Sequence, residues 1–153
     1  MRVNWKKLLI AIAIPLAVGG LSALLSGGMG EAYASYARPP LSPPGWVFAV
    51  VWPILYILMG WASYLVAEAP GEKKKPLTLY GLQLALNFLW PILFFRFEAV
   101  GGALILLIAL WVLVLLKIRS FANVSEKASD LLIPYILWLS FALYLNFGIF
   151  LLN

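Results

Sequence analysis

The sequence contains no cysteine and no histidine, and only 11% of its residues are charged. Without cysteine there are no disulfides and no thiolate chemistry, and without either residue the usual zinc, iron–sulfur, His-ligated haem and His-based triad sites are excluded. Soluble domains have about a quarter of their residues charged, whereas this chain of 153 residues is 64% apolar with a mean hydropathy of +0.98. The composition therefore predicts a membrane protein.

The net charge of +5 comes from 11 Lys and Arg against 6 Asp and Glu. With so little polar surface around them, these basic residues are more typical of anchors against anionic lipid headgroups than of a nucleic-acid site.

Five windows of at least 18 residues contain no charge, and each is long enough to cross a bilayer core, which takes roughly 20 apolar residues. The short turns between most of them favour antiparallel neighbours. The sequence therefore predicts an all-α, integral membrane five-transmembrane-helix bundle, with residues 1–153 forming a single domain. The expected helices cover approximately 5–26, 43–68, 76–96, 99–118 and 130–152.

The basic residues near the ends of the spans predict the orientation of the chain. The positive-inside rule then places the N-terminus in the cytoplasm and the C-terminus outside, in what we expect to be the cytoplasmic membrane of a prokaryote. The side of the N-terminus carries Arg2, Lys6, Lys7, Lys73, Lys74, Lys75, Lys117, Arg119 and Lys127, and the opposite side carries only Arg38 and Arg96.

The N-terminal span has some features of a cleavable signal peptide, because basic residues precede it and Ala32, Tyr33 and Ala34 follow it. Its apolar stretch is longer than the roughly 7 to 15 residues of a signal h-region, so we predict a retained helix.

The connection from 27 to 42 is the only long one, and it serves as either a lid over a binding site or a plain spacer. Its proline-rich end predicts a stiff, extended segment, with Ser42 as the cap of the second helix and Pro43 or Pro44 opening that helix. Asp130 is the expected cap of the last helix, which leaves Pro134 in its first turn.

No charged residue lies inside the windows, so we do not expect a proton relay or ion pathway. Amide and aromatic side chains instead recur at helical spacing, where they either bridge helices or line a binding site. These one-sided stripes are Trp52 and Tyr56, then Gln83, Asn87, Trp90 and Phe94, and finally Tyr135, Trp138, Ala142 and Asn146.

Proline follows tryptophan at Pro53 and at Pro91, where a bend with a free carbonyl group beside a ring would help to open a cavity. Trp5 and Trp46, at the ends of spans, are typical of the interfacial aromatic belt. Gly81 and Ala85 permit close helix approach, either in a homodimer or within the monomer.

Four ordered blocks of the sequence resemble the TspO/MBR family, which comprises the tryptophan-rich sensory proteins of prokaryotes and the translocator (peripheral benzodiazepine receptor) proteins. The blocks are PPLSPPGWVF at 39–48 with Trp52; LY at 55–56, MG at 59–60 and SYLV at 63–66; QLALN at 83–87, WP at 90–91 and FF at 94–95; and PY at 134–135 with Trp138, FA at 141–142 and LN at 145–146.

The resemblance implies a five-helix bundle, often dimeric, with a pocket beside the first loop for tetrapyrroles such as protoporphyrin IX, for benzodiazepine-type ligands and in some members for cholesterol. The matching pocket positions are Tyr33, Trp52, Tyr56, Asn87, Trp90, Trp138, Ala142 and Asn146. Some relatives are reported to degrade protoporphyrin in light, and Trp52 and Trp138 match the residues implicated. The sterol motif is incomplete, because no basic residue follows Asn146.

The first functional hypothesis is a membrane translocator or sensory protein that binds protoporphyrin IX by stacking, with no obligatory cofactor and no metal. Since histidine and cysteine are absent, metal-free porphyrin is preferred over haem. The alternatives are a light- or oxygen-dependent porphyrin-degrading enzyme acting through Trp52 and Trp138, and a passive transporter of porphyrin or sterol.

Overall fold

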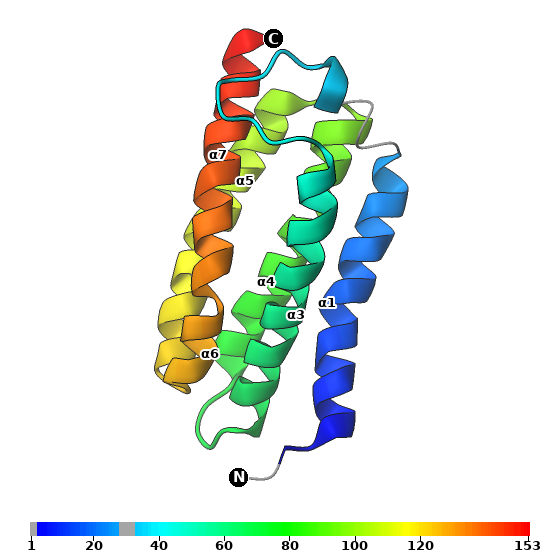
Figure 1. Cartoon of the computed structure of the whole chain (residues 1–153). Coiled ribbons are helices and arrows are strands. Elements are labelled where there is room, and N and C mark those ends of the chain that lie inside the picture. Colours follow the sequence, from blue (N-terminus) through cyan, green and yellow to red (C-terminus); the bar gives the residue numbers. More distant parts are fainter. Residues whose placement is uncertain (1–2, 28–32) are drawn as a thin grey trace.

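The computed structural model describes residues 3–27 and 33–153, and throughout these ranges the ordered elements are helices (Figure 1). Five spans are long and apolar enough to cross a membrane, which confirms the predicted architecture. Two residues on which sequence predictions rest lie outside the described residues: Arg2, for the orientation, and Ala32, for the signal-peptide features. The elements are α1 (Trp5–Ser26), α3 (Trp46–Glu68), α4 (Lys74–Pro91), a π-helical turn η1 (Ile92–Arg96), α5 (Val100–Ala122), α6 (Glu126–Leu131) and α7 (Ile133–Leu152).

Several helix ends differ from the sequence expectation. Ser42 does not cap α3, because its hydroxyl donates to the carbonyl oxygen of Pro39 at 2.6 Å and the helix begins at Trp46. Asp130 lies inside α6, whose cap is Ser125, while Pro134 does fall in the first turn of α7. At Pro91 the chain continues as the π-helical turn η1.

The outer surface of the bundle is apolar along the length of the spans. Leu24 and Ile105 are 79% and 72% exposed in the isolated chain, as expected of side chains that meet lipid. Trp5 and Trp46 are also exposed, at opposite ends of the bundle. This distribution fits a chain embedded in a bilayer with tryptophan at both interfaces.

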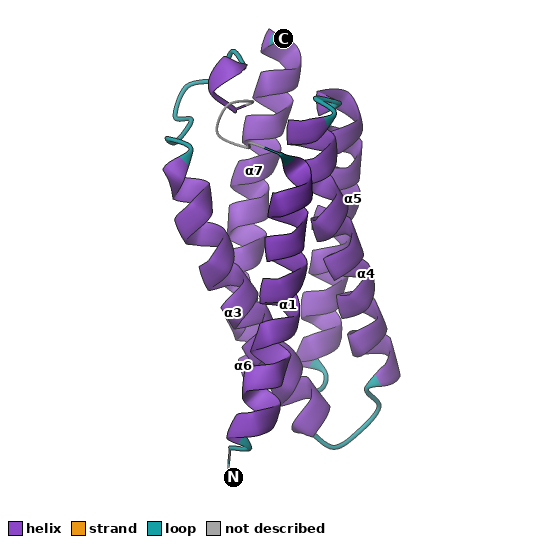
Figure 2. Cartoon of the chain, turned by 90° about the vertical axis from the view of Figure 1, so that its right-hand side faces the viewer, coloured by secondary structure: helices purple, strands orange, loops and turns teal. Residues whose placement is uncertain are grey.

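The helix pair α1 and α3 is held together by a close backbone approach (Figure 2). A Cβ atom built on Gly60 of α3 would lie 2.5 Å from the Cα atom of Ile12 and 2.6 Å from the carbonyl oxygen of Ala11. Because both atoms belong to the backbone of α1, no side-chain movement relieves this contact. Glycine at position 60 therefore sets the distance between the two helices.

Gly81 and Ala85 do not have this role within the monomer. Both are exposed on α4, and a Cβ atom at Gly81 would meet no atom within 4 Å. The structure thus excludes their use in packing inside the monomer, and a homodimer contact through this face stays a prediction.

The described part of the first loop, 33–45, crosses the end of the bundle that carries the C-terminus (Figure 1). It is tied to α7, because the side chain of Asn153 bonds both backbone groups of Ala37 and the Tyr144 hydroxyl donates to the carbonyl oxygen of Pro40. The Tyr36 hydroxyl donates to the carbonyl oxygen of Phe94 at 2.7 Å. Burial, and secondly the charge of Glu98, raises the pKa of Tyr36, so this donor keeps its proton at neutral pH.

Replacing Gly60 by alanine tests the helix approach. Gly60→Ala should lower the free energy of unfolding by about 1–3 kcal/mol, because the new methyl group pushes α1 away from α3. The measurement is thermal unfolding in detergent followed by circular dichroism. Gly102→Ala is the control, since its Cβ atom would meet only Ala99 Cβ, at an ordinary 3.9 Å. Equal melting temperatures for the two variants would contradict the assignment.

Candidate functional site

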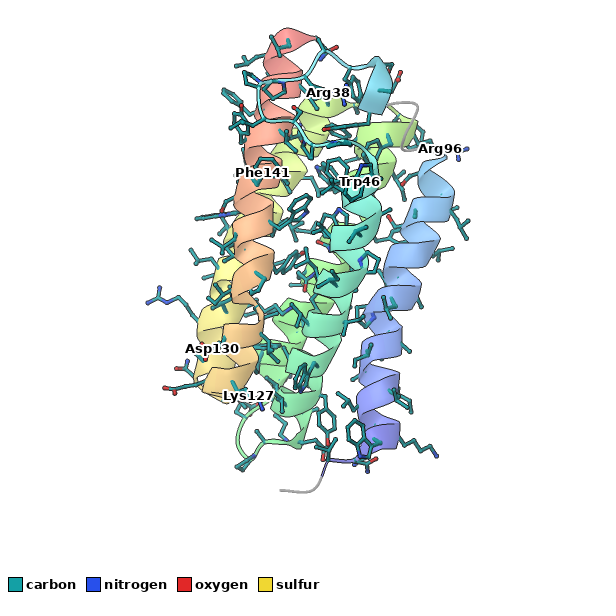
Figure 3. All side chains as sticks on the ribbon, viewed as in Figure 1. Arg38, Trp46, Arg96, Lys127, Asp130 and Phe141 are labelled. Atoms are coloured by element: carbon teal, nitrogen blue, oxygen red, sulfur yellow. The ribbon has the colours of Figure 1, made fainter. Side chains whose placement is uncertain are left out.

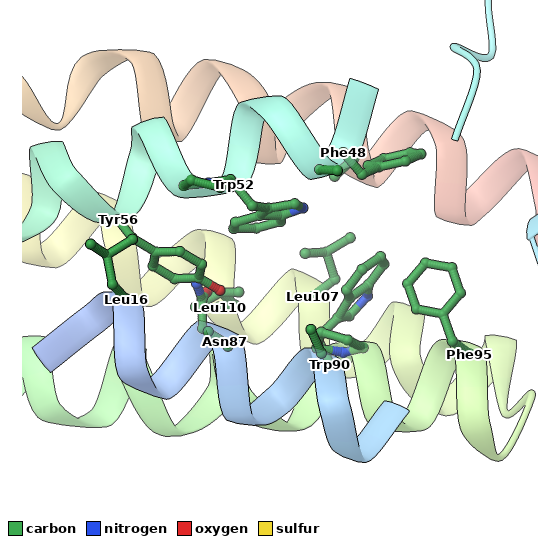
Figure 4. A pocket seen from close by; sticks show the side chains of 16 residues that line it. Leu16, Phe48, Trp52, Tyr56, Asn87, Trp90, Phe95, Leu107 and Leu110 are labelled. Carbon is green, nitrogen blue, oxygen red and sulfur yellow. The ribbon is translucent and has the colours of Figure 1, made fainter. Parts of the chain in front are cut away.

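A partly open cavity of about 290 Å³ lies in the half of the bundle nearer the first loop, between α1, α3, α4, α5 and α7 (Figure 4). Its walls are apolar apart from one amide and the polar tips of aromatic side chains. The lining residues are Leu16, Gly19, Gly20, Ala23, Phe48, Ala49, Trp52, Pro53, Tyr56, Asn87, Trp90, Pro91, Phe95, Leu107, Leu110 and Ala142.

Aromatic rings form two opposite walls of the cavity. On α3, Trp52 and Tyr56 lie one turn apart with ring centroids separated by 5.7 Å. The ring of Trp90 on α4 stacks on the ring of Phe94 in η1, with ring centroids 4.8 Å apart and an angle of 22° between the planes. Figure 4 shows Trp52 and Trp90 facing the space between their helices. Such walls suit a flat, hydrophobic guest.

The wall contributed by α1 is made of small residues. Gly19, Gly20 and Ala23 line the cavity there, and a Cβ atom on Gly19 would lie 2.2 Å from the ring of Tyr56. The absence of a side chain at Gly19 therefore lets the Tyr56 ring lie directly against α1.

Asn87 is the amide that lines the cavity. Its Oδ1 atom accepts a hydrogen bond from the Tyr135 hydroxyl, whereas its Nδ2 atom is buried and has no partner. The hydroxyl group of Tyr56 lies beside this amide (Figure 4). A buried donor without a partner is costly, so Nδ2 is available to a ligand that brings an acceptor.

Asn146 positions a wall of the cavity without lining it. Its Oδ1 atom accepts from Nε1 of Trp90 at 3.0 Å, and its Nδ2 atom donates to the carbonyl oxygen of Val100 at 3.1 Å. These two bonds fix the indole ring of Trp90. Asn146, Ala142 and Tyr33 line a separate void of only about 10 Å³.

Tyr33 closes the loop side of that void. Its hydroxyl donates to the carbonyl oxygen of Pro43 at 2.6 Å, and its ring meets the ring of Phe48 edge-on at 5.0 Å. The guanidinium group of Arg38 lies 4.7 Å from the centre of the Tyr33 ring. Figure 3 shows Arg38 at this end of the bundle. The loop residue is thus a packed cover beyond the cavity, separated from it by Phe48.

Trp138 lies on the other side of Trp52. It lines an open groove of about 450 Å³ between α3 and α7, together with Leu55 and Phe141. Its ring is perpendicular to that of Trp52, with centroids 6.4 Å apart, and its Nε1 atom is buried without a partner. The indole ring of Trp52 therefore stands between the cavity and the part of the groove that Trp138 occupies.

The eight pocket positions named from the sequence are thus divided among three neighbouring spaces. Five line the main cavity: Trp52, Tyr56, Asn87, Trp90 and Ala142. Tyr33 and Asn146 line the small void with Ala142, and Trp138 lines the groove. Sequence reasoning missed the wall from α1 and the contributions of Leu107 and Leu110. In the sequence, the adjacent glycines Gly19 and Gly20 were the signal that other helices approach this helix closely.

The expectation for Lys117 was wrong. It was counted among the anchors at the membrane surface, yet α5 continues to Ala122 and the Lys117 side chain is completely buried. Its Nζ atom donates to Oε1 of Gln83 at 2.6 Å. The spacing contained the signal, since Lys117 continues the buried stripe of Leu107, Leu110 and Val114 at intervals of three and four.

Comparison with known proteins agrees with this architecture. The model of the TspO/MBR family matches residues 11–152. The tryptophan-rich protein TspO of Archaeoglobus fulgidus is 38% identical over 153 residues, covering 98% of this chain and 99% of that protein. The translocator protein of Bos taurus is 40% identical over 139 residues, covering 88% and 82%, and the tryptophan-rich sensory protein of Cereibacter sphaeroides is 33% identical, covering 100% and 95%. The chain belongs to the TspO/MBR family.

Proposed function

We propose that this membrane protein is a sensor or translocator that binds a flat, hydrophobic tetrapyrrole, of which protoporphyrin IX is the representative, in the cavity between its helices. The observation that carries the proposal is the apolar cavity between Trp52 and Trp90 with one unpartnered donor, Nδ2 of Asn87. Ligand sites typically combine apolar walls with a few placed polar groups. Each aromatic pair formed with a ligand adds about 0.5–1.5 kcal/mol beyond the burial of area.

The size of the cavity sets a condition on how a tetrapyrrole binds. At about 290 Å³ it lies at the lower limit of ligand sites, which range over about 300–1,000 Å³. Rotation of the Trp52 ring would connect it with the groove of about 450 Å³ in which Trp138 lies. In this proposal Trp52 moves, and the macrocycle then contacts both Trp90 and Trp138.

The donor set favours a metal-free ligand. The sequence has no histidine or cysteine, and the polar groups beside the cavity are the amide of Asn87 and the hydroxyl of Tyr56. An asparagine amide is not a common axial ligand of haem. Tyrosine can bind haem iron, but it does so as the phenolate, so Tyr56 would first have to lose its proton. Stacking and hydrogen bonding, rather than coordination, therefore hold the ligand in this proposal.

Fluorescence titration tests the site. Protoporphyrin IX added to the detergent-solubilised protein should quench tryptophan emission, and Trp52→Phe or Trp90→Phe should weaken the affinity by about 3- to 10-fold through lost stacking area. Trp138→Phe should weaken it as well if the groove is part of the site. Trp46→Phe is the control, because Trp46 is exposed at the end of α3. Unchanged affinity in both the Trp52 and the Trp90 variants would refute the proposed site.

A second candidate function is the light-dependent breakdown of a bound porphyrin. It is favoured by the direct contact of Trp52 with Trp138. Trp52 lines the cavity, where it could give an electron to the photoexcited porphyrin, which in turn would reduce dissolved oxygen, and the oxidised Trp52 could take an electron from Trp138. The absorption band of protoporphyrin should then decay in illuminated, aerated samples and persist in the dark, and Trp138→Phe should slow the decay. Equal decay with the Trp46→Phe and Trp138→Phe variants would exclude a role for this pair.

The orientation in the membrane is proposed from the exposed basic residues, with the N-terminus inside. Lys127 lies at the end of the bundle opposite Arg38 and Arg96 (Figure 3), and Lys6 and Lys7 belong to the first turn of α1, which begins at the same end as Lys127 (Figure 1). Burial of Lys117 removes one charge from this comparison and leaves its direction unchanged.

Because the chain has no cysteine, single-cysteine variants report the orientation directly. A membrane-impermeant maleimide should label Ala34→Cys in intact bacterial cells expressing the protein, and it should label Lys74→Cys only after lysis. Both positions are exposed, and they lie at opposite ends of the bundle. The reverse labelling pattern would show that the N-terminus faces the exterior.

A further inference from the structure

Lys117 is a basic side chain buried inside the bundle, and the proposed binding function does not by itself require it. Its Nζ atom donates to Gln83 at 2.6 Å and lies 4.2 Å and 5.3 Å from the ring centres of Tyr80 and Phe121. No carboxylate forms an ion pair with Lys117 in the described part of the chain. A basic side chain buried in this way within a membrane span is expensive, and such residues usually serve a function.

A chain of hydrogen bonds leads from Lys117 to the cavity. Nε2 of Gln83 donates to the hydroxyl oxygen of Tyr135 at 3.1 Å and also lies 3.5 Å from the sulfur of Met59. The Tyr135 hydroxyl in turn donates to Oδ1 of Asn87. Gln83, Tyr135 and Asn87 are all buried. The chain ends at the unpartnered Nδ2 atom of Asn87, in the wall of the cavity.

Lys117 determines the direction of this chain. Its Nζ atom donates to Oε1 of Gln83, so Gln83 presents its NH₂ group to Tyr135. Tyr135 accepts that bond and gives its own proton to Asn87, which must therefore present its oxygen to Tyr135. The NH₂ group of Asn87 is then left for the cavity. Without the donor at Lys117, both amides could turn over, and Asn87 would offer its oxygen instead.

We infer that Lys117 is a specificity-determining positioning residue, which makes the cavity select flat apolar ligands that carry a hydrogen-bond acceptor, such as a carboxylate or carbonyl oxygen, at the Asn87 end. The inference rests on the proposed binding function and adds the chemistry that the site selects. A ligand that turns an N–H group toward Asn87 would place two donors together, and a ligand without polar groups would leave Nδ2 unpaired. Polarisation along the chain strengthens the last donor further.

The hydroxyl group of Tyr56 does not change this selection. It lies beside Asn87 and lines the same cavity, but a hydroxyl group rotates to donate or to accept. The amide of Asn87 alone therefore decides whether the site offers a hydrogen-bond donor or an acceptor to the ligand. Figure 4 shows Tyr56 and Asn87 on facing sides of one end of the cavity.

Two porphyrins that differ in their acceptors test the inference. Protoporphyrin IX has two carboxylates, whereas octaethylporphyrin has the same macrocycle and no oxygen atom. The ratio of their affinities should favour protoporphyrin IX in the wild-type protein and fall by about 3- to 10-fold in Lys117→Met, which is the range of one hydrogen bond. Comparing ratios between variants cancels the different partition of the two porphyrins into detergent.

The matched control is Arg119→Met. Arg119 lies on the same helix and is also basic, but it is exposed, so its removal should leave the affinity ratio unchanged. Lys117→Met replaces a buried basic side chain by an apolar one and should fold, as unfolding curves would verify. If the affinity ratio in Lys117→Met equals that of the wild-type protein, whether or not both affinities fall together, the inference is overturned.

A measurement without porphyrin separates this inference from the proposed function. In protein with ¹⁵N-labelled asparagine and glutamine side chains, the NMR signal of the Asn87 NH₂ group, identified by its loss in Asn87→Leu, should shift in Lys117→Met and stay in place in Arg119→Met. If the wild-type protein binds neither porphyrin, the proposed function fails and the amide orientation is judged on this signal. An Asn87 signal that is indifferent to Lys117 would refute the orientation itself.

Discussion

Inside a bundle surrounded by lipid, a polar side chain has no water to bond with, so its partner must come from another helix or from a ligand. The buried amides follow this constraint. Asn146 bonds Trp90 and the backbone of Val100, and Gln83 bonds Lys117 and Tyr135. In Asn87 only the oxygen atom has a hydrogen-bond partner, Tyr135, and the NH₂ group without a partner lies in the wall of the cavity. Among the buried amides of residues 3–27 and 33–153, the incomplete one thus coincides with the space that a ligand would fill.

Close backbone contact and open space are combined in the same helix pair. At Gly60 the backbones of α1 and α3 approach so closely that no side chain fits between them, while at Gly19 the missing side chain makes room for the Tyr56 ring. Further along the same helices, Gly20 and Ala23 of α1 face Trp52 and Ala49 of α3 across the cavity. Small residues therefore serve two purposes: Gly60 of α3 lets the two helices meet, and the small residues of α1 leave space between them.

The described part of the first loop, 33–45, covers the end of the bundle nearest this space. It is bonded to the C-terminal end of α7 through Asn153 and Tyr144, and Pro39 fits against Gly148, where a Cβ atom would lie 2.5 Å from the proline ring. Tyr33 and Phe48 then fill the gap between the loop and the cavity. The cover is a packed layer held by hydrogen bonds between side chains and main-chain groups.

Sequence reasoning was strongest where periodicity and lipid exclusion act on each helix separately. The stripe of Gln83, Asn87 and Trp90 does lie on the buried face of α4, because amide groups avoid lipid whatever the neighbouring helices are. It was weaker for Trp138, whose stripe partners Tyr135 and Asn146 are buried while its own ring faces the groove. The side of a neighbouring ring on which an indole packs depends on the other helix, and no local pattern encodes it.

The sequence by itself determined the five spans, the buried faces of the helices and the family, because hydropathy, helical spacing and ordered motifs are properties of the chain alone. The tertiary structure decided that α1 forms a wall of the cavity, that Trp52 separates it from the groove, and that Lys117 is a buried donor rather than a surface anchor. Each of these depends on which side chains of different helices meet, and that is settled only when the helices pack.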